Sequence, residues 1–370
     1  MAHESKSVPV VPPEIISEIL ARLPVKPLLR MRCVSKSWLS LISSPQFIKN
    51  HLKFSTKKQD FARDRLLFSN SYEYSLRVYA CSLYSIMYQE SPHIPDELDF
   101  LCKDSFVDYN VVGSCDGLFC ISTGSHDLFL WNPSIRKLKE LPFSGSNVHC
   151  SSYLAYGVGY NECQDDYKVV EVMGCSHSDY GFINEFRVYN LRTNSWEMIL
   201  EYPSVIFCND PAKFVNGRLH WIATRVTDKN DSWFVSSLNL MDKSYEKVAL
   251  PDLDDGNFDW ELGTLGGNLS VFCDCYKVRM DVWVMKAYGL VESWTKVASI
   301  PYFTAIEHSI LPVFISHNDE ILLQHGSSLL LYNSTHNTFK HPQVQIPHGY
   351  GIQFCLYIES LVSPHYVEEV

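Results

Sequence analysis

The stretch that decides the fold runs from Leu130 to Leu138 and reads LWNPSIRKL. It combines a short apolar strand ending in asparagine, a polar turn, and a large apolar residue six positions after the asparagine. The pattern recurs, with these two residues at Asn132 and Leu138, Asn190 and Trp196, Asn239 and Tyr245, and Asn333 and Phe339. Residues 280–294 resemble a further copy with a longer turn. A period of about 45–50 residues that contains several strands is typical of β-propeller blades and not of helical repeats.

A second recurring element precedes these copies, in which Asp, Asn or Gly opens a strand. It occurs at residues 116–121, 216–222, 266–272 and 318–323. Glycine beside Asn or Asp supplies the positive φ that a tight hairpin turn requires. Proline is expected to end the outer strands at Leu141-Pro142, Leu250-Pro251 and Ile300-Pro301. Together with a strand pair at 65–69 and 76–83, the sequence predicts about six blades over residues 64–362.

The last apolar strand, residues 354–362, has no repeat unit of its own. We expect it to complete the first blade, because this pairing would close the ring and remove its free edges. Residues 363–370 are then a short C-terminal tail.

The N-terminal segment follows a different, helical pattern. Residues 11–42 read VPPEIISEILARLPVKPLLRMRCVSKSWLSLI, with apolar residues at helical spacing. Pro12-Pro13-Glu14 opens a first helix, Pro24 ends it, and Ser35 is a plausible cap for the helix that carries Trp38. About 45 residues in short helices are too few to bury so many large side chains, so part of this surface needs a partner.

This segment closely resembles an F-box in its opening proline, paired aliphatics, Leu-Pro, Arg-x-Arg-Cys-Val-Ser-Lys run and tryptophan. It departs from the usual pattern at Val11, Pro27 and Met31, where leucine, serine and phenylalanine are common. The resemblance assigns an F-box to residues 8–52 and a linker to 53–63. It implies docking onto the small acidic Skp-type adaptor, and through it onto a cullin. The adaptor-binding residues are then expected to be Pro12, Ile16, Leu20, Leu23, Pro24, Leu28, Val34, Lys36 and Trp38.

The remainder of the chain resembles the F-box-associated, kelch-like domain of plant F-box proteins. The resemblance rests on residues 114–118, 130–138, 166–170 and 357–362. The double glycine of kelch repeats survives at Gly266-Gly267. The fold class expected is therefore multidomain, with a short all-α F-box followed by an all-β kelch-like propeller of about six blades.

Charge is divided unequally along the chain. Through Lys58 there are ten Lys/Arg and three Asp/Glu, a net +7, and the remainder holds 21 and 39, a net −18. The basic charges are not interleaved with aromatic residues, so an acidic protein partner fits the head as well as nucleic acid would. The acidic body carries clusters at Asp96-Glu97, Asp165-Asp166, Asp252 to Asp255 and Glu368-Glu369. We expect a basic target on its loops, with Asp252, Asp254 and Asp255 as candidate contacts, although acidity could equally serve solubility.

Candidate chemistry is sparse. The 12 cysteines include no C-x-x-C pair, and Cys273-Asp274-Cys275 is the closest approach to one. The spacing of His317, His325, His336 and His341 does not put two ligands on one strand face. There is no nucleophile elbow, phosphate-binding glycine loop or His-Glu-x-x-His motif. The sequence thus predicts no catalytic, cofactor or metal site, and it predicts core packing for tryptophans 131, 196, 221, 260, 283 and 294.

Two classes of function remain. The first is a non-catalytic substrate receptor of a cullin-RING (SCF-type) ubiquitin ligase. A narrower version comes from resemblance to S-locus F-box proteins, whose targets are basic ribonucleases. The second is a propeller enzyme or small-ligand sensor with an accessory helical head. No stretch approaches the ~20 apolar residues of a membrane helix, and residues 1–13 carry no secretory pattern, so we expect a cytoplasmic or nuclear location without membrane or nucleic-acid partners.

Overall fold

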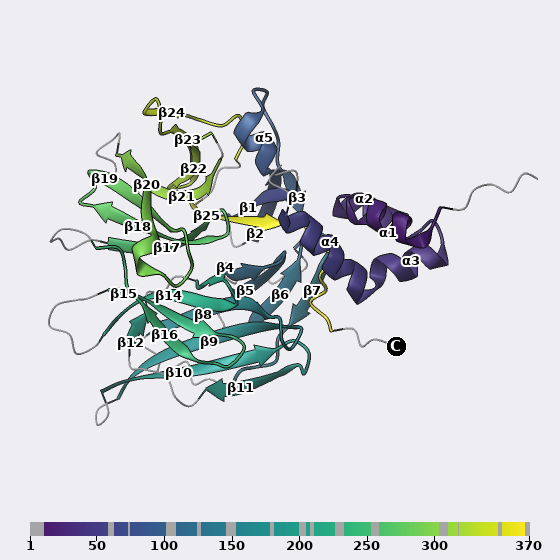
Figure 1. Ribbon diagram of the computed structural model, residues 1–370, viewed down its shortest axis with the longest axis horizontal. Helices are drawn as coiled ribbons and strands as arrows, with labels where there is room; N and C mark the ends of the chain where they lie inside the picture. The colour runs from purple at the N-terminus through teal and green to yellow at the C-terminus, as the bar shows by residue number, and fades with distance from the viewer. Residues whose placement is uncertain are drawn as a thin grey trace, which may run out of the picture.

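The computed structural model shows a helical head attached to a ring of β-sheets (Figure 1). It describes residues 11–57, 63–72, 75–100, 109–123, 127–145, 153–177, 181–199, 205–207, 211–225, 233–252, 259–302, 310–316, 318–346 and 350–366. Within these ranges the strands form six antiparallel sheets, each a blade, which confirms the expected six-bladed propeller behind an N-terminal helical unit.

The first three blades contain four strands each. Blade 1 contains β25 (Tyr350–Ile358), β1 (Asp64–Tyr72), β2 (Ser75–Ser82) and β3 (Asp96–Leu98). Blade 2 contains β4 (Tyr109–Cys115), β5 (Leu118–Thr123), β6 (Leu128–Asn132) and β7 (Lys137–Glu140). Blade 3 contains β8 (Tyr153–Asn161), β9 (Asp166–His177), β10 (Gly181–Asn190) and β11 (Ser195–Ile199).

Blade 4 differs because two short strands, β12 (Val205–Phe207) and β13 (Lys213–Val215), both pair with β14 (Arg218–Arg225). Its outer strands are β15 (Phe234–Asn239) and β16 (Tyr245–Val248). Blade 5 contains β17 (Asp259–Leu265), β18 (Asn268–Cys275), β19 (Arg279–Met285) and β20 (Trp294–Pro301), with the short η2 helix (Val291–Ser293) before β20. Blade 6 contains β21 (Ile310–Ile315), β22 (Glu320–His325), β23 (Ser328–Asn333) and β24 (Thr338–Lys340).

The repeated asparagine pattern corresponds to the third and fourth strands of four blades. Each asparagine is the last residue of a third strand, and the large apolar residue lies on the fourth. The apolar residue faces a partner across the pair, as Trp131–Leu138, Tyr189–Trp196, Leu238–Tyr245 and Tyr332–Phe339. The predicted turn chemistry is also confirmed: φ is +51° at Asp116 and Asn216, and +80° and +75° at the glycines that follow them.

Six tryptophans pack in the apolar core, as the sequence predicted, and the structure places them between blades. Trp131, Trp221 and Trp294 are buried within the packing between neighbouring blades. Trp196, Trp260 and Trp283 are half-buried and pack against the same apolar layers. Core packing therefore accounts for all six of these side chains.

The C-terminal strand closes the ring, as expected. β25 pairs antiparallel with β1, with Leu66 opposite Leu356 and Phe68 opposite Phe354. The strand covers 350–358 and not 354–362, because after Ile358 the chain leaves the sheet and crosses blade 2. There Asn132 Nδ2 donates to the carbonyls of Ser360 at 3.2 Å and Val362 at 2.7 Å. This closure segment (residues 359–366) thus ties blade 1 to blade 2.

The head consists of α1 (Pro13–Ala21), α2 (Val25–Met31), α3 (Lys36–Ser43) and α4 (Pro45–Lys57). Ser35 caps α3, since its Oγ accepts from Trp38 N at 3.2 Å. The expected boundary at residue 52 lies inside α4, which runs on to Lys57. The helix continues because Phe54 still packs on the core of the head and Ser55 is buried. A small additional helix, α5 (Leu83–Tyr88), packs on blade 1.

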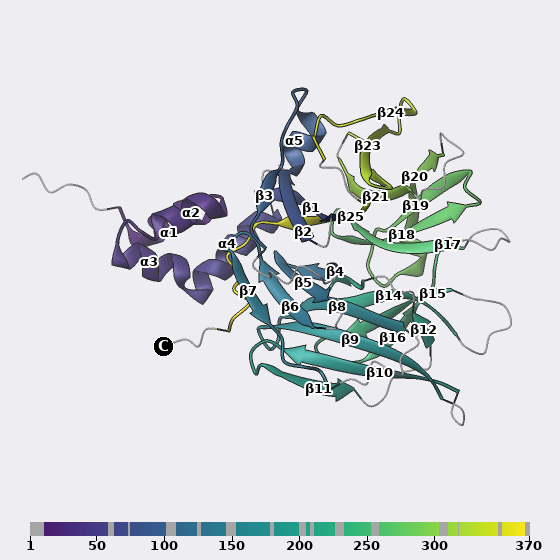
Figure 2. The same cartoon turned by 180° about the vertical axis from the view of Figure 1, so that it is seen from behind.

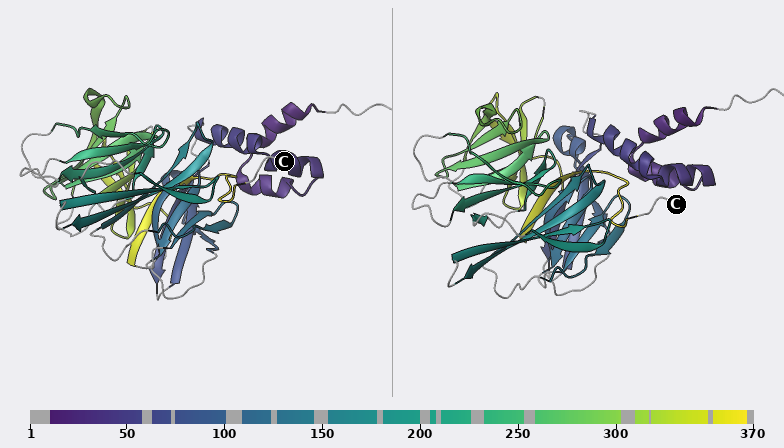
Figure 3. Two further views of the ribbon diagram at one scale, coloured as in Figure 1. Left: turned by 90° about the horizontal axis from the view of Figure 1, so that it is seen from below. Right: turned by 60° about the horizontal axis from the view of Figure 1, so that its bottom comes forward.

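Head and ring share one apolar core. Leu361 of the closure segment is buried among Leu20, Val25, Leu28 and Ile42 of the head, and Ile135 of blade 2 packs against the same cluster. Figures 1 and 3 show the C-terminal segment leaving the ring beside the head helices. Arg63, just before β1, donates to Ser55 Oγ at 2.5 Å and to the Ala21 carbonyl at 3.2 Å. The joint is therefore packed and hydrogen-bonded, so the two parts are held as one body.

No helix in the described part of the chain is both long and apolar enough to span a bilayer.

We predict that Leu361→Ala destabilises head and ring together. The side chain is fully buried, and truncating a buried leucine typically costs about 2–5 kcal/mol in the free energy of unfolding. Urea unfolding of the full chain, followed separately by helical circular dichroism and tryptophan fluorescence, should show both transitions shifted. Leu290→Ala, at a residue 58% exposed, is the matched control and should shift neither. A shift in fluorescence alone would contradict the shared core.

A second prediction concerns His51 of α4. This side chain is fully buried, and its Nε2 lies 2.9 Å from the Leu23 carbonyl. Burial lowers the pKa of His51 to about 4, with the nearby Arg63 charge acting in the same direction. Because the folded pKa is below the ordinary value near 6.5, the head is stabilised above pH ~6.5 and loses that stability as the pH falls toward 4. The loss is at most about 3 kcal/mol.

The measurement is the free energy of unfolding at pH 7 and at pH 4.5 for wild type and His51→Gln, which cannot titrate. The variant should lose less stability between the two pH values than wild type. Equal losses would show that His51 is not held neutral. His220→Gln provides a second comparison, because burial lowers the pKa of that propeller histidine to about 4 as well.

Candidate adaptor and target interfaces

The topology gives the ring two distinct faces. Successive strands of a blade are antiparallel, so turns between first and second strands and between third and fourth strands lie on one face. Turns between second and third strands, and the connections between blades, lie on the other. The head contacts the first of these faces: Ile135 lies between β6 and β7, and Asp165 between β8 and β9. We call it the head-side face and the opposite one the distal face (Figures 1 and 2).

Four of the nine expected adaptor contacts are exposed: Pro12, Pro24, Val34 and Lys36. Ile16, Leu23 and Trp38 are half-buried and pack against the core of the head. The structure corrects the expectation for Leu20 and Leu28, which are 2% and 0% exposed. Their side chains are core residues that a partner could contact only if the head unfolded.

The head has exposed apolar residues that the sequence did not single out. Large side chains lie in solvent at Val11, Ile15, Ile19, Val34 and Leu39. Ile15 and Ile19 are four residues apart on α1, so they share one helix face, and Ile16 and Leu20 share the inner face. The signal was in the sequence, because the apolar stripe of α1 was too broad for one buried face. Periodicity alone could not say which part of the stripe points outward.

The acidic cluster at Asp165-Asp166 does not form a free binding surface. Asp165 makes an ion pair of 2.5 Å with Lys49 of α4, and it also accepts from Tyr160. Asp166 is buried and accepts from Lys168 Nζ at 3.0 Å and from Arg192 N at 2.8 Å. One carboxylate therefore fastens the head to blade 3, and the other is part of the blade interior.

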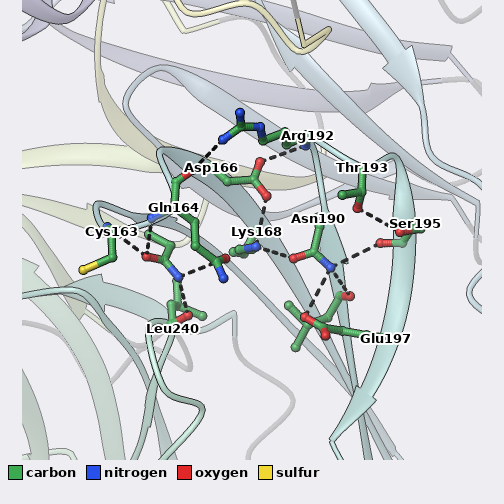
Figure 4. A network of polar contacts seen from close by, with 12 residues as sticks. Cys163, Gln164, Asp166, Lys168, Asn190, Arg192, Thr193, Ser195, Glu197 and Leu240 are labelled. Atoms are coloured by element: carbon green, nitrogen blue, oxygen red, sulfur yellow. Dashed lines mark hydrogen bonds and ion pairs between the residues drawn. The ribbon is translucent and has the colours of Figure 1, made fainter.

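Figure 4 shows how far this interior network extends. Lys168 also donates to Asn190 Oδ1, and Asn190 Nδ2 donates to Glu197 Oε1 at 3.2 Å. Glu197 in turn pairs with Lys243 of blade 4 at 2.7 Å. Every charge in this chain of contacts has an opposite charge or an amide beside it. The network therefore joins blades 3 and 4.

The other acidic clusters lie elsewhere on the ring. Asp96 pairs with Arg65 at 2.9 Å, and Glu97 beside it is exposed. Asp252 is exposed and follows β16, the last strand of blade 4, so it lies on the distal face. Asp254, Asp255, Glu368 and Glu369 lie outside the described residues. Asp252 is thus the expected target contact that the structure places on the face the head leaves open.

Among the described residues, the candidate metal ligands are not gathered into a site. Cys273 and Cys275 are buried with their sulfur atoms 3.9 Å apart, and burial raises the pKa of both thiols. A protonated thiol is a poor metal ligand. Among the described residues no three His, Cys, Asp or Glu side chains are placed to hold one ion. His317 lies outside those residues.

Comparison with known proteins identifies both parts of the chain. Residues 11–50 match the F-box domain, and residues 70–364 match the F-box associated beta propeller domain. The chain is 32% identical over 369 residues to an F-box/kelch-repeat protein of Arabidopsis thaliana, with 96% of each chain covered. It is 30% identical over 326 residues to the F-box protein CPR1 of Arabidopsis thaliana, covering 78% of this chain and 73% of that protein.

Among solved structures, the chain resembles the SapL1 lectin in complex with alpha methyl fucoside. The TM-score is 0.43 at 10% identity, covering 74% of this chain and 93% of the lectin. The domain matches together span most of the sequence, and the helical head and six-bladed ring follow the same division. The chain belongs to the family of F-box proteins that carry an F-box-associated β-propeller.

Proposed function

We propose that this protein is the substrate-recognition subunit of a cullin-RING (SCF-type) ubiquitin ligase. Its head binds a Skp-type adaptor, and its propeller binds the protein to be ubiquitinated. An F-box joined to a propeller is typical of substrate receptors. Such a receptor performs no bond chemistry itself; it raises the effective concentration of the target at the ligase.

The observation that carries this proposal is the exposed apolar surface of the head. Val11, Ile15, Ile19, Val34 and Leu39 are each between 46% and 62% exposed, although the core of the head is already filled. Five large apolar side chains in about thirty residues leave more apolar surface in water than isolated exposures would. Exposed Lys26 and Arg30 lie on α2 and exposed Lys36 on α3, so the head also offers positive charge to an acidic adaptor.

The rigid joint supports the same role. Leu361, Arg63 and the Lys49–Asp165 ion pair fix the head against one face of the ring. A target held on the distal face would therefore keep a constant distance and orientation relative to the adaptor. A transfer reaction that works by proximity benefits from such pre-organisation.

The target class that fits the body is a basic protein. The residues after Lys58 carry a net −18, and Asp252 is exposed on the distal face. A field of this sign speeds encounter with cationic partners and opposes nucleic acid. The S-locus version of the proposal would make that basic partner a ribonuclease.

We predict that Ile15→Asp combined with Ile19→Asp weakens adaptor binding by about 30-fold or more, because apolar anchors dominate such interfaces and a buried unpaired charge is costly. Binding of the full chain to purified Skp-type adaptor is measured by calorimetry. The melting temperature should stay near wild type, since both side chains already lie in solvent. Leu28→Asp should instead unfold the head, because Leu28 is a core residue.

Phe143→Asp is the matched control for the adaptor experiment. Phe143 is 75% exposed on the connection between blades 2 and 3, on the distal face. It should leave adaptor affinity unchanged. If the Ile15, Ile19 double variant binds the adaptor as tightly as Phe143→Asp does, then α1 is not the docking surface.

For the target, we predict that replacing Asp252, Asp254 and Asp255 together by Asn slows association more than it speeds release, because exposed charge acts mainly on encounter. Wild-type affinity should fall as salt rises from about 0.05 to 0.5 M. Asp242→Asn makes a like change on the head-side turn between β15 and β16 and should have little effect. If the target proves acidic, or if its affinity does not change with salt, the prediction is wrong. Recognition would then rest on apolar contacts.

A further inference from the structure

The centre of the ring holds a cavity that the proposed receptor function does not use. It has a volume of about 410 Å³ and is lined by strands of five blades: β4, β13, β17, β21 and β25. Pockets that hold small organic molecules typically measure about 300–1,000 Å³. The channel is therefore large enough for a small molecule, while a folded partner would remain outside.

Much of the channel wall is apolar. Phe214, Leu262, Phe272, Leu311 and Phe354 contribute to it from four different blades. Gly263 is required for this arrangement, because a Cβ there would lie 2.3 Å from the ring of Phe272. The absence of a side chain at Gly263 thus leaves room for the tip of the Phe272 ring against β17.

A single basic side chain lies among these apolar residues within the described wall. Lys213 of β13 lines the channel and is half-buried. Its ammonium group has no ion pair or hydrogen bond in the part of the chain that the structure describes. Two other sheltered basic side chains of the propeller are paired: Lys168 with Asp166 at 3.0 Å, and Arg218 with Glu246 at 2.8 Å. Half-buried Lys139 lies over the ring of Tyr189, 5.6 Å from its centroid.

Hydrogen-bond donors line the same channel as Lys213. Gln353 Oε1 accepts from Val111 N at 3.1 Å, and within the described wall this leaves the Gln353 amino group to donate into the channel. Ser114 adds a hydroxyl from β4. Glu261 also lines the channel, but it is engaged in an interaction of its own. Gln324 donates its amino group to the carbonyls of Gly326 and Ile352, so its Oε1 is left as an acceptor in the wall. The positive charge of Lys213, with the Gln353 amino group and the Ser114 hydroxyl as donors, nevertheless favours a ligand that carries negative charge.

The field of Lys213 acts inside the channel. Cys355 of β25 lies in the same wall, and its sulfur is 3.5 Å from Ser114 Oγ. Burial raises the pKa of this thiol, while the Ser114 hydrogen bond and the positive charge of Lys213 both oppose the rise. The ammonium of Lys213 is thus close enough to Cys355 to stabilise a negative charge at that part of the channel wall.

We propose that the central channel binds a small organic anion, with its carboxylate or phosphate on Lys213 and its apolar part against the aromatic wall. The anion would supply the opposite charge that this sheltered lysine lacks. Because the cavity is built from strands of five blades and exists only in the closed ring, ligand binding should also stabilise that ring. This site is independent of the head and of Asp252, so it stands or falls separately from the receptor function.

The first test uses pyridoxal 5′-phosphate, an anionic aldehyde. Its aldehyde condenses with an unprotonated lysine amine to an imine with loss of water, and borohydride then adds hydride to give a stable secondary amine. Mass spectrometry of the full chain should show saturable labelling of Lys213. Inorganic phosphate and benzoate should each slow it at least fivefold. Lys137, an exposed residue of β7, is the control and should label in proportion to reagent, without protection.

The second test is thermal and does not depend on labelling. Benzoate or phosphate should raise the melting temperature of wild type and of Lys213→Arg, which keeps the charge, but not of Lys213→Gln. A folded Lys213→Gln variant with the full ligand shift would overturn the proposal. So would labelling of Lys213 that neither anion slows, or that is no faster than labelling of Lys137. Protection by the target protein alone would reassign the channel to target binding.

Discussion

The pairing of β25 with β1 is the constraint on which the rest of the structure depends. It joins residues nearly three hundred positions apart, with Leu67 opposite Cys355. This pairing supplies the fourth strand of blade 1. Without it, five complete blades would end in an open edge of unpaired backbone groups. The strand also determines where the following residues go. Because β25 ends on the head-side face, the closure segment passes directly beneath the helices, and Leu361 enters their core.

The same connection gives the head a stability that its own length cannot provide. Four short helices bury few residues among themselves, and a unit of this size is marginal alone. Burial of Leu361 and the bonds from Arg63 to Ser55 and Ala21 extend its core into the propeller. The interior of the head is completed by the ring, so its outer apolar residues remain available to a partner. If the proposed adaptor docking is right, stability and binding draw on different faces of one helix, α1.

Much of the fold could be predicted because each repeat is specified by residues that are close together in the sequence. The asparagine that ends a third strand, the positive φ at Asp116, and the unmatched last strand each follow from short stretches of sequence. The site could be predicted less well, since it depends on contacts between distant residues. No short stretch of sequence shows that Leu20 faces inward and Ile19 outward, or that Lys49 forms an ion pair with Asp165. The channel around Lys213 arises only when five blades meet.

The structure shows which carboxylates of the acidic body are paired with basic side chains. Asp166 is neutralised by Lys168, and buried Asp281 by Lys296 at 2.9 Å and Arg279 at 3.1 Å. Each such pair removes a basic charge along with an acidic one, so interior pairing cannot reduce the net −18. The excess negative charge must therefore lie on carboxylates without a cationic partner. Burying such a carboxylate costs free energy, so these groups are expected in water. The head covers part of one face and brings basic residues with it, whereas Asp252 is exposed on the opposite face. The proposal of a cationic target therefore rests on the carboxylates of the distal face, of which Asp252 is one.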